Sequence, residues 1–322
     1  MANKIFISCL ETFGDVVLMS TICRNIKLRY PDAEITFLTD PRYKGLLENN
    51  PDIYRIWDGQ IKNFQDVYVK SMYDKFQHVY FPMMVTQEDT MWHHDLEARY
   101  HLVDFYAKRC DNLVLSDRRT FIYPDDKDKQ KVEEEFVKYP LLKERVPVSI
   151  HVSSPVASKS WGVKNFKKLV IALERMGCVV MQVGAESDEK VQTPSIVNMC
   201  GKLTPRQTAW ALSKTMMYVG IDSGPAYLAD SMGVPSVILY GATTHIQAGP
   251  LSPLSIPLEP QRKQEFPCGP SHMTCSTHCQ IGSPCILTLE PEHVIQFTVN
   301  MLNGIVQKIA EYQKKTQAIP AS

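Results

Sequence analysis

The chain has 322 residues, 44% of them hydrophobic, which is enough for two cores of ordinary domain size. Lysine plus arginine and aspartate plus glutamate both number 35, so the formal net charge at pH 7 is zero. This balance excludes a global positive field that would recruit nucleic acid or an anionic membrane, and we expect no nucleic-acid partner.

The first residues, MANKIFISCLETFGD, contain an apolar run too short to span a membrane. They also lack the basic start and the cleavage site of a signal peptide. We therefore expect a cytoplasmic protein, with at most peripheral contact with the inner face of the membrane.

The N-terminal region has the pattern of a βαβ unit. Residues 4–10 predict a buried strand, residues 15–29 a helix, and residues 34–39 a second strand. Such units form parallel sheets. The predicted elements that follow are short strands at 53–57 and 79–81 and a helix at 95–109 with one buried side.

Residues 125–145 are dense in charges of both signs and predict a solvated helix that leads into a second unit. We place the domain boundary after this helix, giving an N-terminal domain of residues 1–145 and a C-terminal domain of residues 146–322. The second series has predicted strands at 146–152, 178–183 and 216–221 and predicted helices at 165–176 and from Thr204-Pro205 to residue 213. Two such series predict two Rossmann-like domains, with a ligand cleft at the carboxyl ends of their strands.

The segment YVGIDSGPAYLADSMGVPSVILYGAT, from Tyr218 to Thr243, predicts a strand, a tight turn, a helix and a strand. The turn is Asp222-Ser223-Gly224-Pro225. Gly224 would let backbone approach a ligand and Pro225 suits a helix start, so the turn predicts a diphosphate site at a helix N-terminus. The alternative is that Asp222 and Ser223 merely cap the helix. Beyond the turn, residues 251–270 are proline-rich and predict irregular structure, and residues 291–312 predict a final amphipathic helix.

Three stretches occur in a telling order: GDVVLMSTICRNIKLRYPDAEITFLTD near the start, SKSW at Ser158 to Trp161, and GIDSGPAYLADSMGVPSVILYGAT. Together they resemble glycosyltransferase family 9, the ADP-heptose:lipopolysaccharide heptosyltransferases and their relatives. The resemblance implies a GT-B fold of two Rossmann-like domains facing a central cleft. It also implies that the C-terminal domain holds the nucleotide sugar, that the N-terminal domain holds the acceptor, and that transfer inverts the anomeric carbon.

Asp15 is the predicted general base. An inverting transfer needs a carboxylate to take the proton of the acceptor hydroxyl, and Asp15 follows Gly14 in the turn after the first strand. It also matches the acidic residue that the family uses for this step. The alternative is that Asp15 only caps its helix, which Asp does well.

Lys159 matches the family lysine that contacts the donor phosphates. A fixed cation beside the departing diphosphate would replace a catalytic metal ion, so we expect that catalysis requires no cofactor. A lone loop lysine is otherwise ordinary solvated surface. The remaining predicted donor-binding residues are Gly14, Ser153, Thr204, Asp222, Ser223, Gly224 and Pro225; Thr204 is equally an ordinary helix cap.

Tyr227 departs from the family pattern. The family commonly has His three residues after the glycine, as in DSGPMHLA, and this chain has Tyr227. Because tyrosine is not cationic at neutral pH, a phosphate contact made by that histidine would be weaker here.

Four cysteines crowd the segment after the last predicted Rossmann strand: Cys268, Cys275, Cys279 and Cys285. Four thiols invite a tetrahedral zinc or iron, although no spacing is the Cys-x-x-Cys of zinc knuckles. The cluster is similar in kind to the four-cysteine iron site of family-related heptosyltransferases that modify autotransporter proteins. A reduced, metal-free loop is the alternative. His93, His94, Asp95 and His101 fall on different faces of a predicted helix and indicate the acceptor side or the surface.

The sequence thus predicts an inverting glycosyltransferase that moves a sugar, heptose by the resemblance, from a nucleoside diphosphate donor such as ADP-heptose. The expected acceptor is lipopolysaccharide core or a related saccharide or lipid-linked saccharide. Two alternatives stay open: a protein O-heptosyltransferase with a cysteine-bound metal, and a nucleotide-sugar-binding module without turnover. A nicotinamide dehydrogenase is disfavoured because CLETFGD has one glycine where the dinucleotide fingerprint has three.

Overall fold

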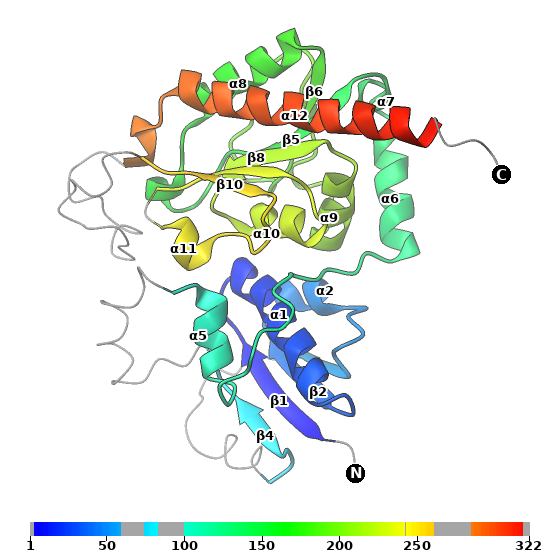
Figure 1. Cartoon of the computed structure of the whole chain (residues 1–322), viewed down its shortest axis with the longest axis vertical. Helices are drawn as coiled ribbons and strands as arrows, with labels where there is room; N and C mark the ends of the chain where they lie inside the picture. The colour runs from blue at the N-terminus through cyan, green and yellow to red at the C-terminus, as the bar shows by residue number, and fades with distance from the viewer. Residues whose placement is uncertain (1–2, 59–73, 83–99, 242, 261–284, 318–322) are drawn as a thin grey trace.

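The computed structural model describes residues 3–58, 74–82, 100–241, 243–260 and 285–317. Within them the chain forms two parallel β-sheets with helices packed around them (Figure 1). The predicted α/β class with two Rossmann-like units is confirmed. The predicted helix at 95–109 is described only from residue 100, where α5 covers Leu102–Lys108.

The N-terminal sheet has the strand order β3-β2-β1-β4, and every described pair in it is parallel. Its strands are β1 (Lys4–Cys9), β2 (Glu34–Thr39), β3 (Arg55–Asp58) and β4 (His78–Tyr80). The helical elements of this unit are α1 (Phe13–Arg29), η1 (Pro41–Tyr43), α2 (Lys44–Leu47) and α5. Six apolar residues of β1 and β2 are fully buried or nearly so because both faces of these strands are covered: Ile5, Phe6, Ile7, Ile35, Phe37 and Leu38.

The C-terminal sheet has the order β10-β9-β8-β5-β6-β7 and is also parallel throughout its described pairs. Its strands are β5 (Val146–His151), β6 (Cys178–Gln182), β7 (Val197–Asn198), β8 (Met217–Ile221), β9 (Ser236–Leu239) and β10 (Ser255–Leu258). Its helical elements are η2 (Ala157–Lys159), α8 (Val163–Arg175), α9 (Pro205–Ser213), α10 (Gly224–Ser231), α11 (His245–Ala248), η5 (Cys285–Thr288) and α12 (Pro291–Gln317). In Figure 1, α12 runs along the outer side of this unit, and it packs against α8.

The prediction of irregular structure for residues 251–270 is wrong at β10, which pairs with β9 from Ser255↔Ser236 to Leu258↔Leu239. Pro257 lies within this strand. The sheet tolerates the proline because β10 is an edge strand, where one side of the backbone needs no ladder partner. β7 and α11, each four residues or shorter, are two further elements without a prediction.

One buried apolar cluster crosses between the two units. It contains Val16 and Val17 of α1 together with Ala226 and Tyr227 of α10. The charged segment at 125–145 forms α6 (Asp126–Phe136) and α7 (Leu141–Glu144). Arg206 of α9 bonds to Asp128 of α6 with Nε 2.8 Å from Oδ2 and to Glu48 at 3.0 Å, so α6 lies against the second unit.

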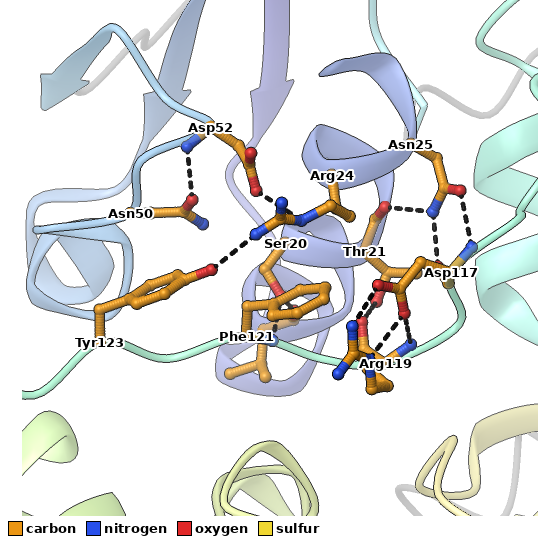
Figure 2. Close-up of polar contacts among 11 residues, drawn as sticks. Ser20, Thr21, Arg24, Asn25, Asn50, Asp52, Asp117, Arg119, Phe121 and Tyr123 are labelled. Atoms are coloured by element: carbon orange, nitrogen blue, oxygen red, sulfur yellow. Dashed lines mark hydrogen bonds and ion pairs between the residues drawn. The ribbon is translucent and has the colours of Figure 1, made fainter. Parts of the chain in front are cut away.

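A linker, residues 117–123, connects α5 to α6 and runs along α1 (Figure 2). Asn25 donates to the Asp117 carbonyl and accepts from the Asp117 N–H, at 2.6 and 3.0 Å. Arg24 donates to the Tyr123 hydroxyl at 3.0 Å and pairs with Asp52 at 3.1 Å. The other contacts are Thr21 Oγ1 to the Arg119 carbonyl and the Phe121 N–H to Ser20 Oγ. The linker is therefore fastened to the N-terminal unit.

Among the described residues, no helix is at once long enough and apolar enough to cross a membrane.

Candidate active site

The candidate site lies where the strands of the second sheet end. β5 and β8 pair in parallel, with His151 opposite Gly220, so their carboxyl ends reach the same edge. Asp222 and Ser223 follow β8 directly, and Lys159 lies in η2 in the loop after β5. The topology thus brings together residues that are more than 60 positions apart in the sequence.

Lys159 and Asp222 form an ion pair, with Nζ 2.7 Å from Oδ2. The Asp222 side chain is 5% exposed, and its Oδ2 also accepts a hydrogen bond from Thr243 Oγ1. The Lys159 side chain keeps 25% of its surface exposed. Buried Asp222 therefore holds the Lys159 ammonium in place. Because the Lys159 side chain is partly exposed, its ammonium can also contact a bound anion.

Ser223 precedes α10 at the N-cap position but makes no side-chain hydrogen bond to that helix. Its hydroxyl instead lies 2.8 Å from His151 Nδ1 and 3.1 Å from the Ile221 carbonyl. His151 Nε2 in turn lies 3.1 Å from Asp188 Oδ2. Burial raises the pKa of Asp188, but hydrogen bonds from His151 and the Ala185 N–H outweigh burial and hold that pKa below its ordinary value.

The capping interpretation of this turn is wrong for both side chains, since Asp222 pairs with Lys159 and Ser223 with His151. Gly224 begins α10 and Pro225 is its second residue. The close approach that Gly224 permits is to the Phe13 ring: a Cβ there would lie 2.5 Å from Phe13 Cδ1. Phe13 belongs to the N-terminal unit, so this glycine brings the two units into contact at the site.

Tyr227 stands where the family commonly has histidine, and its contacts indicate a structural role rather than a ligand-binding one. Its hydroxyl donates to the Ala248 carbonyl at 2.6 Å, and its side chain is buried. A Cβ on Gly14 would lie 2.8 Å from its ring. Burial, reinforced by Asp222, raises the pKa of Tyr227 well above the ordinary value, so it is a neutral packing residue between the units.

Asp15 occupies the third position of α1 and does cap it. Oδ2 accepts from the Thr12 N–H at 3.1 Å and from the Thr12 hydroxyl at 2.7 Å. Oδ1 accepts from the Tyr106 hydroxyl at 2.7 Å. The residue is half-buried in the first turn of the helix that follows β1, beside the Gly14 contact with Tyr227. Burial and the Asp15 charge raise the pKa of Tyr106. The Tyr106 hydroxyl therefore stays protonated and donates a hydrogen bond to the Asp15 carboxylate.

Two predicted donor-binding residues are engaged elsewhere. Thr204 is the N-cap of α9 in a capping box with Gln207, and its side chain has no described contact with Lys159 or Ser223. Ser153 follows β5, and its hydroxyl accepts from the Glu189 N–H at 3.0 Å. Ser153 therefore supports the loop that carries Asp188.

Of the four clustered cysteines, Cys268, Cys275 and Cys279 lie outside the described residues, as do His93, His94 and Asp95. Cys285 begins η5, which packs against η2. The end of the cluster is thus close in space to the Lys159 loop, although far from it in sequence. Among the described residues no group of three or more His, Cys, Asp or Glu is arranged to hold a metal ion. His101 caps α5, and its Nε2 donates to the Gly249 carbonyl at 2.7 Å.

Sequence reasoning missed His151, Asp188 and Thr243 as parts of the site. His151 ends a strand, and Asp188 follows the next one, so the rule that ligands bind at strand ends could have found both. Tyr106 carried no such signal, because it falls among the apolar positions of a helix.

The chain matches the family model of glycosyltransferase family 9 (heptosyltransferase) over residues 91–277. Lipopolysaccharide heptosyltransferase 3 of Escherichia coli is 24% identical over 286 residues, which cover 72% of this chain and 82% of that protein. The crystal structure of a family 9 glycosyltransferase from Veillonella parvula superposes with a TM-score of 0.75 at 19% identity, covering 94% and 98% of the two chains. TibC, an iron-containing dodecameric heptosyltransferase from enterotoxigenic E. coli solved with ADP-D-β-D-heptose, gives a TM-score of 0.65 at 12% identity over 94% of this chain and 77% of TibC.

These likenesses confirm the predicted GT-B fold. The family model covers more than half of the sequence, and the matched region includes Lys159 and Asp222, which meet at one edge of the second sheet. The chain belongs to glycosyltransferase family 9 and is a glycosyl-transferring enzyme of the heptosyltransferase type.

Proposed function

We propose that the chain transfers heptose from ADP-heptose to a saccharide of the lipopolysaccharide core or a related acceptor, with inversion at the anomeric carbon. The donor is supported by the ligand of TibC, and the acceptor by the name of the E. coli relative. The observation that carries the proposal is Lys159, a partly exposed cation fixed on buried Asp222 beside the N-terminus of α10. A fixed cation and a helix N-terminus are the two features that a departing diphosphate needs.

The proposed chemistry is a single displacement. Asp15 accepts the proton of the acceptor hydroxyl as that oxygen attacks the anomeric carbon and the nucleoside diphosphate leaves. Tyr106 and Thr12 hold the Asp15 carboxylate through three hydrogen bonds, which fix its orientation. Lys159 and the positive end of the α10 dipole stabilise the negative charge that grows on the leaving group.

The test is product formation. The purified chain is incubated with a panel of nucleotide sugars that includes ADP-heptose, UDP-glucose and GDP-mannose, together with lipopolysaccharide core acceptors that lack successive sugars. Mass spectrometry of the acceptor is expected to show one added heptose with ADP-heptose only. Transfer to a protein hydroxyl instead would support the protein O-heptosyltransferase alternative. Binding of ADP-heptose without transfer to any acceptor would support the binding module.

The cysteine cluster enters the proposal only as a structural site. Iron is named for TibC, and the four thiols of this chain would supply a tetrahedral set for zinc or iron. No step of the proposed reaction passes through a metal.

A further inference from the structure

His151 lies behind the proposed phosphate site with both ring nitrogens engaged. Nδ1 is 2.8 Å from Ser223 Oγ, and Nε2 is 3.1 Å from Asp188 Oδ2. The His151 side chain is 7% exposed and the Asp188 side chain 16%. The glycine at 184 makes room for this arrangement, because a Cβ there would lie 2.1 Å from the Asp188 carboxylate and 3.1 Å from the His151 ring.

The carboxylate of Asp188 fixes the state of the ring. An ionised carboxylate only accepts hydrogen bonds, so Nε2 carries a hydrogen and donates it to Asp188. In the neutral ring Nδ1 is then an acceptor, and the single hydrogen of the Ser223 hydroxyl points at it. In that state Ser223 has no hydrogen to offer a phosphate oxygen.

Protonation of the ring reverses this contact. With hydrogens on both nitrogens, Nδ1 donates to Ser223 Oγ, and the hydroxyl hydrogen turns from the ring to another acceptor, either the Ile221 carbonyl at 3.1 Å or a bound phosphate oxygen. We propose, on the basis of the function proposed above, that His151 is a positioning residue that takes up a proton from solvent when the donor diphosphate binds, and so turns the Ser223 hydroxyl toward the phosphate. The ring gains one proton and one positive charge, and no covalent bond changes.

The titratable and charged groups nearest His151 come from four elements. On the loop after β6, Asp188 contributes a negative charge, and Lys190 lies near enough to influence that carboxylate. On the turn after β8, the charge of Asp222 is already matched by Lys159 of η2. On β8, Tyr218 is buried, and burial keeps its pKa high, so it stays neutral. The diphosphate would add negative charge beside Ser223 and raise the proton affinity of the ring.

The test is calorimetric titration with ADP in chelator, at pH 7.5, in two buffers with different ionisation enthalpies. The difference in apparent heat gives the number of protons taken up. Wild type is expected to take up a measurable fraction of a proton. Its ADP affinity should fall as pH rises from 7.0 to 8.5, by at most about tenfold per unit for one linked proton. The terminal phosphate is largely ionised over this range, because its second pKa is near 6.

Two variants isolate His151. His151→Asn keeps a hydrogen-bonding group near Ser223 but does not titrate, so proton uptake should vanish and the pH profile should flatten. Asp188→Asn keeps an acceptor for Nε2–H but removes the anion. Without that negative charge the ring should lose its proton at lower pH. The pH range over which ADP affinity falls should therefore move to lower pH in this variant. His78→Asn is the matched control: His78 also pairs with a carboxylate, Asp111 at 3.2 Å, but lies at the start of β4, and its variant should behave as wild type.

The outcomes separate the two proposals. If wild type binds ADP without proton uptake, or if His151→Asn takes up protons as wild type does, the role of His151 is overturned while the diphosphate site stands. If wild type does not bind ADP at all, the diphosphate site and the role of His151 are both overturned.

Discussion

Asp15 divides its two carboxylate oxygens between two tasks. Oδ2 takes both hydrogen bonds from Thr12, which complete the cap of α1, and Oδ1 takes the hydrogen bond from Tyr106. The sequence left capping and catalysis as alternatives for this residue. The structure shows the cap, and it leaves Oδ1 in a contact that is not part of the cap. The two interpretations are therefore compatible, and mutation can separate them.

Asp15→Asn is expected to lower turnover about 100-fold or more while leaving ADP affinity nearly unchanged, because it removes the base and not the phosphate site. Thr12→Val is the control, since it removes the cap hydroxyl but keeps the carboxylate. Both variants should lose about 1 kcal/mol of folding stability or less. Steady-state kinetics, ADP calorimetry and thermal unfolding measure the three quantities. Equal turnover losses in the two variants would reduce Asp15 to a cap.

Lys159→Met is expected to weaken ADP binding by roughly tenfold, since it removes a charge-assisted contact and leaves buried Asp222 without its cation. The loss in turnover should be larger than the loss in affinity, because negative charge on the leaving group grows toward the transition state. Lys129→Met, which removes an exposed ion pair with Asp126 on α6, is the control and should change neither. Unchanged ADP affinity in Lys159→Met would remove this lysine from the site.

The residues of the site differ in how far the sequence could predict them. Lys159 and Asp222 were predicted because each follows a strand within a recognisable motif. Their direct pairing depends on β5 and β8 being neighbours in the sheet, which no local pattern encodes. The chain from Asp188 through His151 to Ser223 depends likewise on the order β8-β5-β6. The sequence thus predicted residues singly, and the topology assembled them.

At the scale of elements, the long apolar segments of the first sheet were predicted well. The strand at 34–39 was predicted with its exact bounds, and α1 begins two residues before its predicted start. β10 was missed because Pro257 and its flanking prolines outweigh four residues of strand, and only an edge position makes that proline tolerable. Local pattern therefore identified the buried elements better than the edge of the sheet.

Helix α10 meets α1 through two glycines, which sets up a test of that interface. Gly14→Ala would place a methyl group 2.8 Å from the Tyr227 ring. We expect it to cost about 1–3 kcal/mol of stability through overpacking and to lower turnover, because Asp15 is the next residue. Gly45→Ala, where nothing lies within 4 Å of the new methyl, is the matched control. It should be neutral or stabilise by up to about 1 kcal/mol. Denaturant unfolding measures the free energy of unfolding of both variants. Equal values for the two would contradict the close packing of Gly14 against Tyr227.

Element η5 begins at Cys285, the last residue of the cysteine cluster, and packs against η2, which carries Lys159. Trp161, four residues after Ala157, donates from Nε1 to the Leu289 carbonyl at 2.8 Å, and Ile286 would contact a Cβ at Gly241. The cysteine cluster is far from Lys159 along the chain, but its last residue, Cys285, lies in an element that packs against η2. A structural metal on these cysteines would therefore stabilise η5, which packs against the Lys159 loop, as well as the C-terminal segment.

The cluster is predicted to hold about one zinc or iron per chain in protein purified under reducing conditions without chelator. Replacing Cys275 and Cys279 together by serine should lower the thermal midpoint more than it lowers the turnover of the molecules that stay folded. Elemental analysis and thermal unfolding measure this. Protein that is free of metal and folds normally would identify a reduced loop instead.

At the scale of the whole molecule, the two units touch at several separate points around the site. Phe13 lies against Gly224, and His101 donates to the Gly249 carbonyl. At the far end of α10, Thr120 of the linker donates to buried Asp230 at 2.8 Å. Asp15 on one unit and Lys159 on the other are thus held in a relation that depends on the angle between the units.

The contacts of the linker determine where the chain can bend when the angle between the two units changes. Residues 117–123 are hydrogen-bonded along α1, whereas α6 begins at Asp126 and lies against α9. A rigid rotation of one unit against the other would carry the linker with α1 and α6 with α9. The Thr120 contact with Asp230 and the α1 contact with α10 would have to shift in such a rotation. In the backbone between the linker and α6, the torsions next to Pro124 would absorb the turn, and the proline ring already fixes one of them. The connection between the units is therefore a short hinge rather than a flexible tether, and torsional changes at Tyr123 and Asp125 would change the separation of Asp15 and Lys159.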